Sequence, residues 1–403
     1  MFLTYIKNFS LFLFVFVAFN DTVAEEYIGN FVIKGAFALF VVTHSLDLYA
    51  MMFNVKTYVM KNFYLFMLTI TTISLVTYLF KSDMMHITDM LEVSFLRIVS
   101  FFVIFIYVTY TKEFTKLLYM IWISLIVSST IAAFSDPYEQ WTFRRVGGTG
   151  NPNDFAAQLL PVMFITYYLF KKNHSWIFLI GSNLFFLYTL VYAGSKSSFL
   201  FLALLLAIAF VVRFKAILEF LTTTKGFMSL VLTIMIVISA GVYIQQDEAV
   251  KGMQERSKKS GTMQQRFIIW NAGAEMIRDN FFLGVGFAQF PKISGSYIKE
   301  YLPPEALPSH NNFVKIFAES GVFTFVMFVS FILALFMSQI RAIFSTDYFW
   351  IYLATLSAVM MSMTIPSLHH KDFWISIALL SHVIYILSYK NHDEDEKISS
   401  QTI

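Results

Sequence analysis

The sequence predicts an all-α protein that crosses a membrane many times. Of its 403 residues, 57% are hydrophobic and only 14% are charged, whereas a soluble chain carries about a quarter charged residues. The apolar residues form long continuous blocks, unlike the alternating runs of about ten residues that form barrel strands. Because lipid offers the backbone no hydrogen-bond partners, blocks of this kind are expected to be helices.

About twelve blocks approach the roughly 20 apolar residues that a membrane-spanning helix needs. The predicted helices are 9–19 (extended toward Phe2), 28–46, 63–80, 94–110, 117–134, 155–170, 176–193, 198–212, 227–244, 322–340, 348–365 and 373–389. The first block follows a lysine, as in a signal peptide, but no cleavage pattern is clear and a retained helix is expected. Lysine and arginine gather in alternate short loops, which places both chain ends in the cytoplasm.

Residues 1–390 are therefore predicted to form a single transmembrane domain. Between the ninth and tenth helices, one large loop, 245–312, lies outside the cytoplasm, and the polar tail 391–403 is expected to be disordered. Within the loop, Phe267, Trp270, Ala274 and Ile277 recur at the spacing of one helix face. The chain has no cysteine, which excludes a thiol nucleophile and a disulfide framework.

Polar segments concentrate on one predicted membrane face. They follow the fifth, seventh, ninth and eleventh helices, all on the non-cytoplasmic side, and comprise 144–154, 194–198, 266–291, 309–312 and 369–371. Charged residues inside the predicted spans are few, and the exceptions, Lys34 and Arg97, lie near helix ends. This distribution favours a site at the membrane surface over one at the midplane.

The first polar segment suits a phosphate ligand. Arg144 and Arg145 stand beside a glycine-rich turn, and a guanidinium group binds phosphate oxygens through two hydrogen bonds. Asn151 and Asn153 follow the turn and precede a helix, so an ordinary capping turn with arginines at the membrane surface explains the same residues. Lys196, in a second short turn, either reaches an anionic group or marks the membrane boundary.

The long loop supplies the other candidates. Arg266 has no obvious acidic neighbour on its helix, whereas Arg278 has Glu275 three residues before it. His310 can act as a base or hydrogen-bond donor, although a lone histidine before a helix is also a common cap. Glu319 is expected to be the buried partner of Lys315. Neither a cofactor motif nor a metal-binding motif accompanies these residues.

These residues resemble motifs of the O-antigen ligase and polymerase superfamily of bacterial envelope enzymes. His310 and Asn311, then nine residues, Gly321, two residues and Thr324 match one family pattern. A second pattern is similar to the stretch that contains Arg266, Trp270, Asn280, Gly284 and Gly286, with Phe281 where proline is usual.

Two shorter segments extend the resemblance. Residues 150–153 read Gly-Asn-Pro-Asn and precede Phe155 and Ala156, as in the family. Residues 194–196 resemble a turn that normally carries arginine, with Lys196 in its place. The resemblance covers roughly 144–321, and the helix layout covers the rest.

The resemblance implies a metal-independent glycosyltransferase of GT-C-like architecture, without a cofactor, in the bacterial inner membrane. Its donor would be a glycan on undecaprenyl diphosphate, bound at the periplasmic face. His310 would orient or deprotonate the acceptor hydroxyl, and Arg266 would stabilise the departing diphosphate. Contacts to the diphosphate or glycan are implied for Arg144, Arg145, Asn151, Asn153, Lys196 and Asn311.

Three functions remain open. An O-antigen ligase transfers the glycan to the lipid A-core, and it is favoured by the 150–153 segment and by the Arg266–Trp270 stretch. A polymerase would use the same donor, with a second lipid-linked repeat unit as acceptor. A small-anion transporter would place its charges near the midplane and within repeated halves, and the sequence shows neither feature.

Overall fold

The computed structural model describes residues 2–80, 95–134, 146–149, 151–172, 175–224, 261–298 and 307–401. Every regular element in these ranges is helical, which confirms the all-α prediction. The first half contains α1 (Phe2–Phe19), α2 (Asp21–Ile28), α3 (Asn30–Thr43), α4 (Ser45–Met52), α5 (Tyr58–Phe80), α6 (Leu96–Tyr110), α7 (Phe114–Phe134), α8 (Pro152–Lys172), α9 (Trp176–Ala193), α10 (Lys196–Val212) and α11 (Phe214–Leu221).

The second half contains the loop helices and the last spans. Its elements are α14 (Gly261–Asp279), α15 (Phe290–Tyr297), α16 (Asn312–Met337), α17 (Ile340–Ser345), α18 (Phe349–Met361), the 3₁₀ helix η3 (Ser367–His369) and α19 (Lys371–Gln401). Helix α19 continues to Gln401, so most of the tail that was expected to be disordered is helical. The predicted span 227–244 lies outside the described residues.

Several helices are long and apolar enough to cross a membrane. Among the described residues, five helices meet this condition, namely α1, α5, α7, α16 and the part of α19 up to Tyr389, and the bent pair α2–α3 would be a sixth. Four shorter apolar helices, α6, α9, α10 and α18, lie beside them. The chain is therefore a multi-pass membrane protein.

The predicted second span, 28–46, is broken in the structure. Helices α2 and α3 meet at an angle of 116°, and Gly29 between them has φ 106°. Glycine alone adopts such a backbone readily, so the helix direction changes there. A second break follows at His44, between α3 and α4. The apolar composition predicted one continuous span, but it did not reveal the change of direction at Gly29.

Aromatic side chains join the central helices. The Phe63 ring of α5 stacks on Phe105 of α6 with 4.0 Å between centroids, and Phe105 meets Phe331 of α16 at 5.3 Å. On the same core, Trp374 of α19 stacks on Phe101 at 4.9 Å. Helix α5 packs along α16, α6 along α19, and α8 along α18. This packing fixes the helix ends that carry the polar segments.

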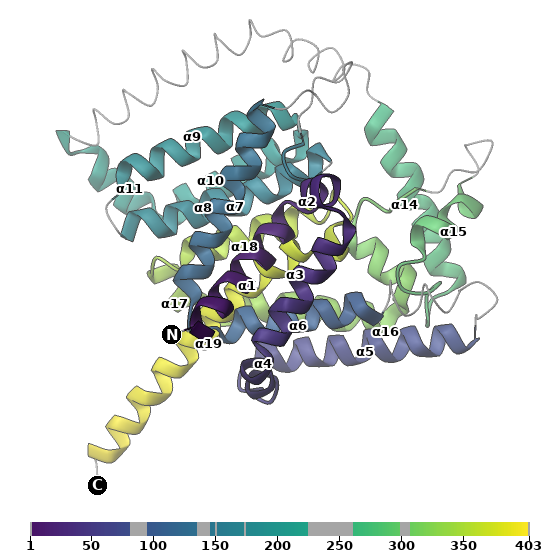
Figure 1. The fold of residues 1–403 in the computed structure, drawn as a ribbon, viewed down its shortest axis with the longest axis horizontal. Coiled ribbons are helices and arrows are strands. Elements are labelled where there is room, and N and C mark those ends of the chain that lie inside the picture. The colour runs from purple at the N-terminus through teal and green to yellow at the C-terminus, as the bar shows by residue number, and fades with distance from the viewer. Residues whose placement is uncertain are drawn as a thin grey trace, which may run out of the picture.

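Figure 1 shows how the loop helices lie relative to the bundle. Helices α14 and α15 stand at one side of the bundle, where they pack against α16, while the N-terminus lies on the opposite side and α19 projects from that side to the C-terminus. The assignment of the two ends of the bundle to the two membrane faces stays a prediction.

Candidate functional site

A backbone clasp attaches the long loop to α16. Helix α16 is interrupted at Gly321, whose φ of 72° and ψ of −179° are not helical. Across this break, the Val322 amide donates to the Phe281 carbonyl at 2.9 Å, and the Val285 amide donates to the Ala318 carbonyl at 2.8 Å. A side chain at Gly321 would collide with the Phe282 carbonyl. The glycine is therefore needed for the close approach of two backbones.

The turn at 284–286 completes the clasp from the other side. Gly284 has φ 70°, and a Cβ atom there would collide with the Glu319 backbone. The Gly286 amide donates to the Glu319 carbonyl at 2.9 Å. The Asn280–Gly286 motif and the motif that contains Gly321 thus meet in one structural contact.

Glu319 holds the clasp with its side chain as well. Its carboxylate accepts hydrogen bonds from the Ala288 amide at 2.9 Å and from the Phe290 amide at 3.0 Å. Glu319 and Lys315 are both buried, and they lie near enough to interact electrostatically. The predicted burial of the two residues is confirmed, but the hydrogen bonds described for the Glu319 carboxylate go to backbone amides.

Helix α14 packs its apolar side against α15 and α16. The buried residues are Ile269, Ala272 and Met276, whereas Phe267 is 54% exposed. The sequence predicted the helix correctly but assigned its buried face about one residue away. Val314 Cγ1 of α16 lies close to Gly273, so tight packing against α16 determines which residues are buried. This rotation leaves Arg266 and Trp270 half-buried.

Trp270 connects α14 to the segment that carries His310. Its indole Nε1 donates to the Ser309 carbonyl at 3.1 Å. The next residue, His310, has φ 49°, an uncommon backbone for a residue other than glycine. Asn311 then caps α16, because its Oδ1 accepts from the Phe313 amide at 2.9 Å and the Val314 amide at 3.3 Å. The capping role that was considered for His310 therefore belongs to Asn311.

His310 and Arg266 lie close together at this end of the bundle. Burial, and to a smaller extent the positive charge of Arg266, lower the pKa of His310 to about 4. Burial also lowers the pKa of Arg266, although a guanidinium group stays charged at neutral pH. The site thus contains a neutral imidazole beside a fixed cation.

Of the other predicted site residues, Arg144 and Arg145 lie outside the described residues. The rest are described and stand at the beginnings of helices. Asn151 is exposed, and its Oδ1 accepts from the Asn153 amide at 2.8 Å, which is the geometry of a capping turn. Lys196, also exposed, is the first residue of α10. Neither Asn151 nor Lys196 is placed against His310 by a described contact.

Hydrogen bonds nevertheless join most of the polar segments. Ser197 beside Lys196 contacts Thr364, with 3.3 Å between hydroxyl oxygens. Asn312 donates from its backbone amide to the Ser362 carbonyl at 2.9 Å, and its Oδ1 accepts from the Leu368 amide at 3.0 Å. The segments around 194–198, 309–312 and 369–371 therefore meet at one end of the bundle.

The glycine turn of the first segment is attached to the start of α2. The Gly148 carbonyl accepts from the Thr22 amide at 3.1 Å, and the Gly148 amide donates to the Ser128 hydroxyl at 2.9 Å. Asp154, a few residues on, interacts electrostatically with His370. This segment, too, lies at the polar end of the bundle.

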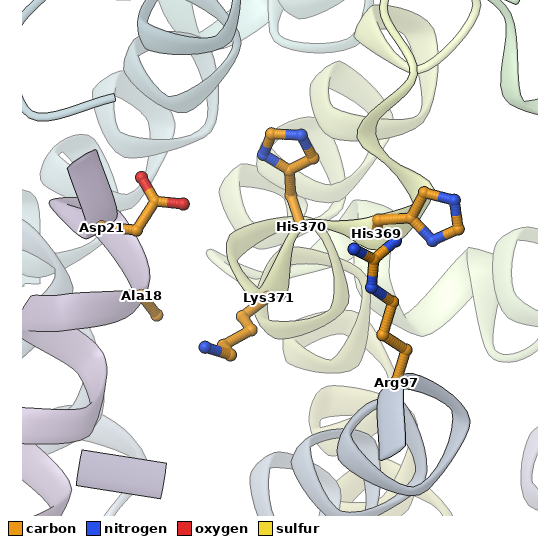
Figure 2. Close-up of a pocket in the computed structure, with 6 residues that line it drawn as sticks. All are labelled: Ala18, Asp21, Arg97, His369, His370 and Lys371. Carbon is orange, nitrogen blue, oxygen red and sulfur yellow. The ribbon is translucent and has the colours of Figure 1, made fainter. Parts of the chain in front are cut away.

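A cavity of ≈ 200 Å³ opens beside the 369–371 segment, and the sequence did not predict it. Its lining combines residues from α1, α2, α6, and the turn into α19, namely Ala18, Asp21, Arg97, His369, His370 and Lys371 (Figure 2). The position of Arg97 in an apolar helix was the available signal, because ionisable residues in such helices commonly have functional roles.

Comparison with known families supports the motif resemblance. The O-antigen ligase family model matches residues 181–329, a range that contains Arg266, His310 and both halves of the clasp. The comparison with curated proteins gives no match. The cavity residues Asp21, Arg97 and 369–371 fall outside the matched range. Residues 181–329 of this multi-pass membrane protein therefore carry a domain of the O-antigen ligase family.

Proposed function

We propose that the protein is a membrane glycosyltransferase that transfers a glycan from undecaprenyl diphosphate at the periplasmic face of the bacterial inner membrane. The observation that carries this proposal is the half-buried pair Arg266 and His310. The family match covers both residues. The clasp and the Trp270–Ser309 hydrogen bond hold their two segments together across the long loop.

The proposed reaction requires the two functions that these side chains can provide. The acceptor hydroxyl oxygen attacks the anomeric carbon, and the bond from that carbon to the diphosphate oxygen breaks. Negative charge grows on the departing diphosphate, and a fixed guanidinium group stabilises it more in the transition state than in the ground state. Arg266 supplies that cation, so the proposed transfer is independent of a metal ion.

His310 is proposed to orient the acceptor hydroxyl and accept its proton. With a pKa of about 4, the imidazole of the empty site is neutral at pH 7 and has a free nitrogen lone pair. An anionic diphosphate bound to Arg266 would offset the repulsion between the two cations, and this would raise the pKa of His310 toward the value of a useful base. Donor binding would then activate the base.

The position of the charged residues favours transfer over transport. Lys315 is the fourth residue of α16, Lys371 is the first residue of α19, and Asp21 is the first residue of α2. A transporter would be expected to place its ionisable groups near the membrane midplane. Here they lie at helix ends, where a lipid-linked headgroup would be held.

The first test is genetic. His310→Ala and Arg266→Ala should each abolish surface glycan assembly while the protein still accumulates in the membrane. The matched control is Arg278→Ala. Arg278 lies on the same helix, its side chain is 75% exposed, and its Nε lies 3.4 Å from Oδ1 of the neighbouring Asp279. Normal glycan assembly in both site variants would refute the proposal.

The same strains identify the acceptor. Loss of all O-chains with accumulation of polymerised lipid-linked glycan would identify a ligase that uses lipid A-core, which is the acceptor we favour. A core that carries a single repeat unit would identify a polymerase that uses a second lipid-linked repeat unit.

A further inference from the structure

The cavity lined by Arg97 and Lys371 is chemically distinct from the Arg266–His310 site. Helices α2, α6 and α19 each contribute a residue near their first turn, and Figure 2 shows the side chains of Arg97, His369 and His370 around the opening. None of these residues belongs to the family-matched range 181–329. The proposed transfer chemistry at His310 leaves this cavity without a role.

Positive charge exceeds negative charge in the lining. Arg97 and Lys371 are the basic side chains of the lining, and Asp21 is the only carboxylate among the lining residues that the structure describes. Beyond the lining, Asp372 interacts with Lys371, and Asp154 and Asp372 both interact with His370. The Asp21 carboxylate already accepts a hydrogen bond from the Thr22 amide at 2.9 Å. Glu319 interacts with Arg97, but its two oxygens accept the Ala288 and Phe290 amides. Arg97 is therefore only partly neutralised, whereas Lys371 has two carboxylates, Asp21 and Asp372, near it.

His369 supplies an independent indication of a ligand. Both of its ring nitrogens are buried and lack a hydrogen-bond partner, and Figure 2 shows the ring beside the Arg97 guanidinium group. The Phe287 ring contacts His369 edge-on, with 5.3 Å between centroids, so the imidazole is held in place. A buried polar group without a partner destabilises the folded protein, and a bound ligand that hydrogen-bonds to it would remove that penalty.

An anion fits this lining better than a cation. The Arg97 guanidinium group would repel a metal ion, and a hard cation prefers several oxygen ligands, whereas the described lining supplies one carboxylate, Asp21. A phosphate group, in contrast, accepts hydrogen bonds from a guanidinium group, an ammonium group and an imidazole N–H. Helix α19 also begins at Lys371, and the positive end of a helix dipole favours an anion. The cavity of ≈ 200 Å³ equals roughly seven water volumes at about 30 Å³ each, enough for a phosphate group and part of a sugar.

The cavity is connected to the proposed catalytic residues by a short buried path. Asn312, two residues after His310, accepts the Leu368 amide at 3.0 Å and donates to the Ser367 hydroxyl at 3.1 Å. His369 follows directly. Two neighbouring sites at one end of the bundle suit a reaction that brings together two lipid-linked molecules.

We propose that the cavity formed by Arg97, His369 and Lys371 is a second anion-binding site, which takes a phosphate group of the acceptor glycolipid while the donor occupies the Arg266–His310 site. The assignment to the acceptor rests on the proposed glycosyltransferase function. Phosphate binding itself does not depend on that function, because the charge and the unpartnered imidazole are properties of the cavity.

The test is chemical labelling of Lys371 in the purified full-length protein in phosphatidylcholine nanodiscs. Acetic anhydride modifies accessible lysines, and mass spectrometry measures the extent at each one. Inorganic phosphate, compared with chloride at equal ionic strength, should reduce labelling of Lys371 by about threefold when phosphate is at twice its Kd, since two thirds of the sites are then filled. Labelling of Lys112, which is exposed, should not change.

Two variants separate this site from the proposed catalytic site. Arg97→Gln should remove the protection of Lys371 by phosphate, and Arg266→Gln should leave it intact. The inference would be overturned if phosphate protected Lys371 from labelling equally in wild type and in Arg97→Gln. It would also be overturned if phosphate never reduced the labelling of Lys371, or if acetic anhydride never modified it. Activity of the Arg266 and His310 alanine variants is a separate readout, so the proposed function can fail while phosphate binding is retained.

A final comparison identifies the source of the phosphate. Phosphorylated lipid A-core in the nanodisc should protect Lys371, and the same glycolipid after phosphatase treatment should not. Protection by inorganic phosphate alone, with neither form of the glycolipid effective, would refute the assignment to the acceptor.

Discussion

Replacement of Gly321 by alanine should detach the long loop from α16. The residue has φ 72° and ψ −179°, a region essentially restricted to glycine, where another residue is strained by about 1–3 kcal/mol. The new Cβ atom would also collide with the Phe282 carbonyl. To relieve that collision, the two backbones would have to move apart. The three clasp hydrogen bonds made by the amides of Val285, Gly286 and Val322 would then be lost, and each contributes about 0.5–1.5 kcal/mol to stability.

Together these effects amount to roughly 3–7 kcal/mol of lost stability. The assay is thermal unfolding of the detergent-solubilised protein, in which Tm should fall by roughly 4–8 °C for a chain of this size. Gly181→Ala is the matched control, because a Cβ atom on that helical glycine meets nothing within 4 Å and should be neutral or stabilising by up to about 1 kcal/mol. A Gly321→Ala protein that melts like wild type would refute the clasp.

Further predictions concern the segment around His310. Trp270→Phe removes the hydrogen bond to the Ser309 carbonyl and should reduce transfer activity. The control Trp122→Phe removes an indole hydrogen bond to the Ser182 hydroxyl at 3.2 Å; it should lower stability by a similar amount, about 1 kcal/mol, without loss of activity. Steady-state transfer rates of the two variants test this difference. The folded-state pKa of His310 is lowered to about 4, so the unfolded chain binds the proton more tightly, and the stability of the fold should decrease as pH drops from about 6.5 toward 4. In unfolding curves, His310→Gln should weaken this dependence of stability on pH. An unchanged dependence would contradict the burial of the imidazole.

The sequence predicted the helical fold because long apolar blocks have few alternatives in lipid. Boundaries agree closely where no break intervenes, as at α9. They differ where a glycine changes the chain direction, as at Gly29 and Gly321. Helix α16 begins ten residues before the predicted span of 322–340, because the helix starts at the Asn311 cap and continues across the kink.

The candidate site was predictable only in part. Arg266, Trp270 and His310 stand out through their spacing in a recognisable pattern, and the structure brings them together. The cavity around Arg97 was not predictable, because its residues are dispersed over four elements and share no motif. Spacing along the chain reveals residues that act within one segment, whereas a cavity formed at helix ends depends on tertiary packing.

The rate of glycan transfer in proteoliposomes, with purified donor and acceptor lipids, tests the central claim most directly. Loss of the imidazole in His310→Ala should lower the rate by about 10²–10⁴-fold while Arg278→Ala remains near wild type. Transfer by His310→Ala and Arg266→Ala at the wild-type rate would contradict the assignment of the reaction to this pair.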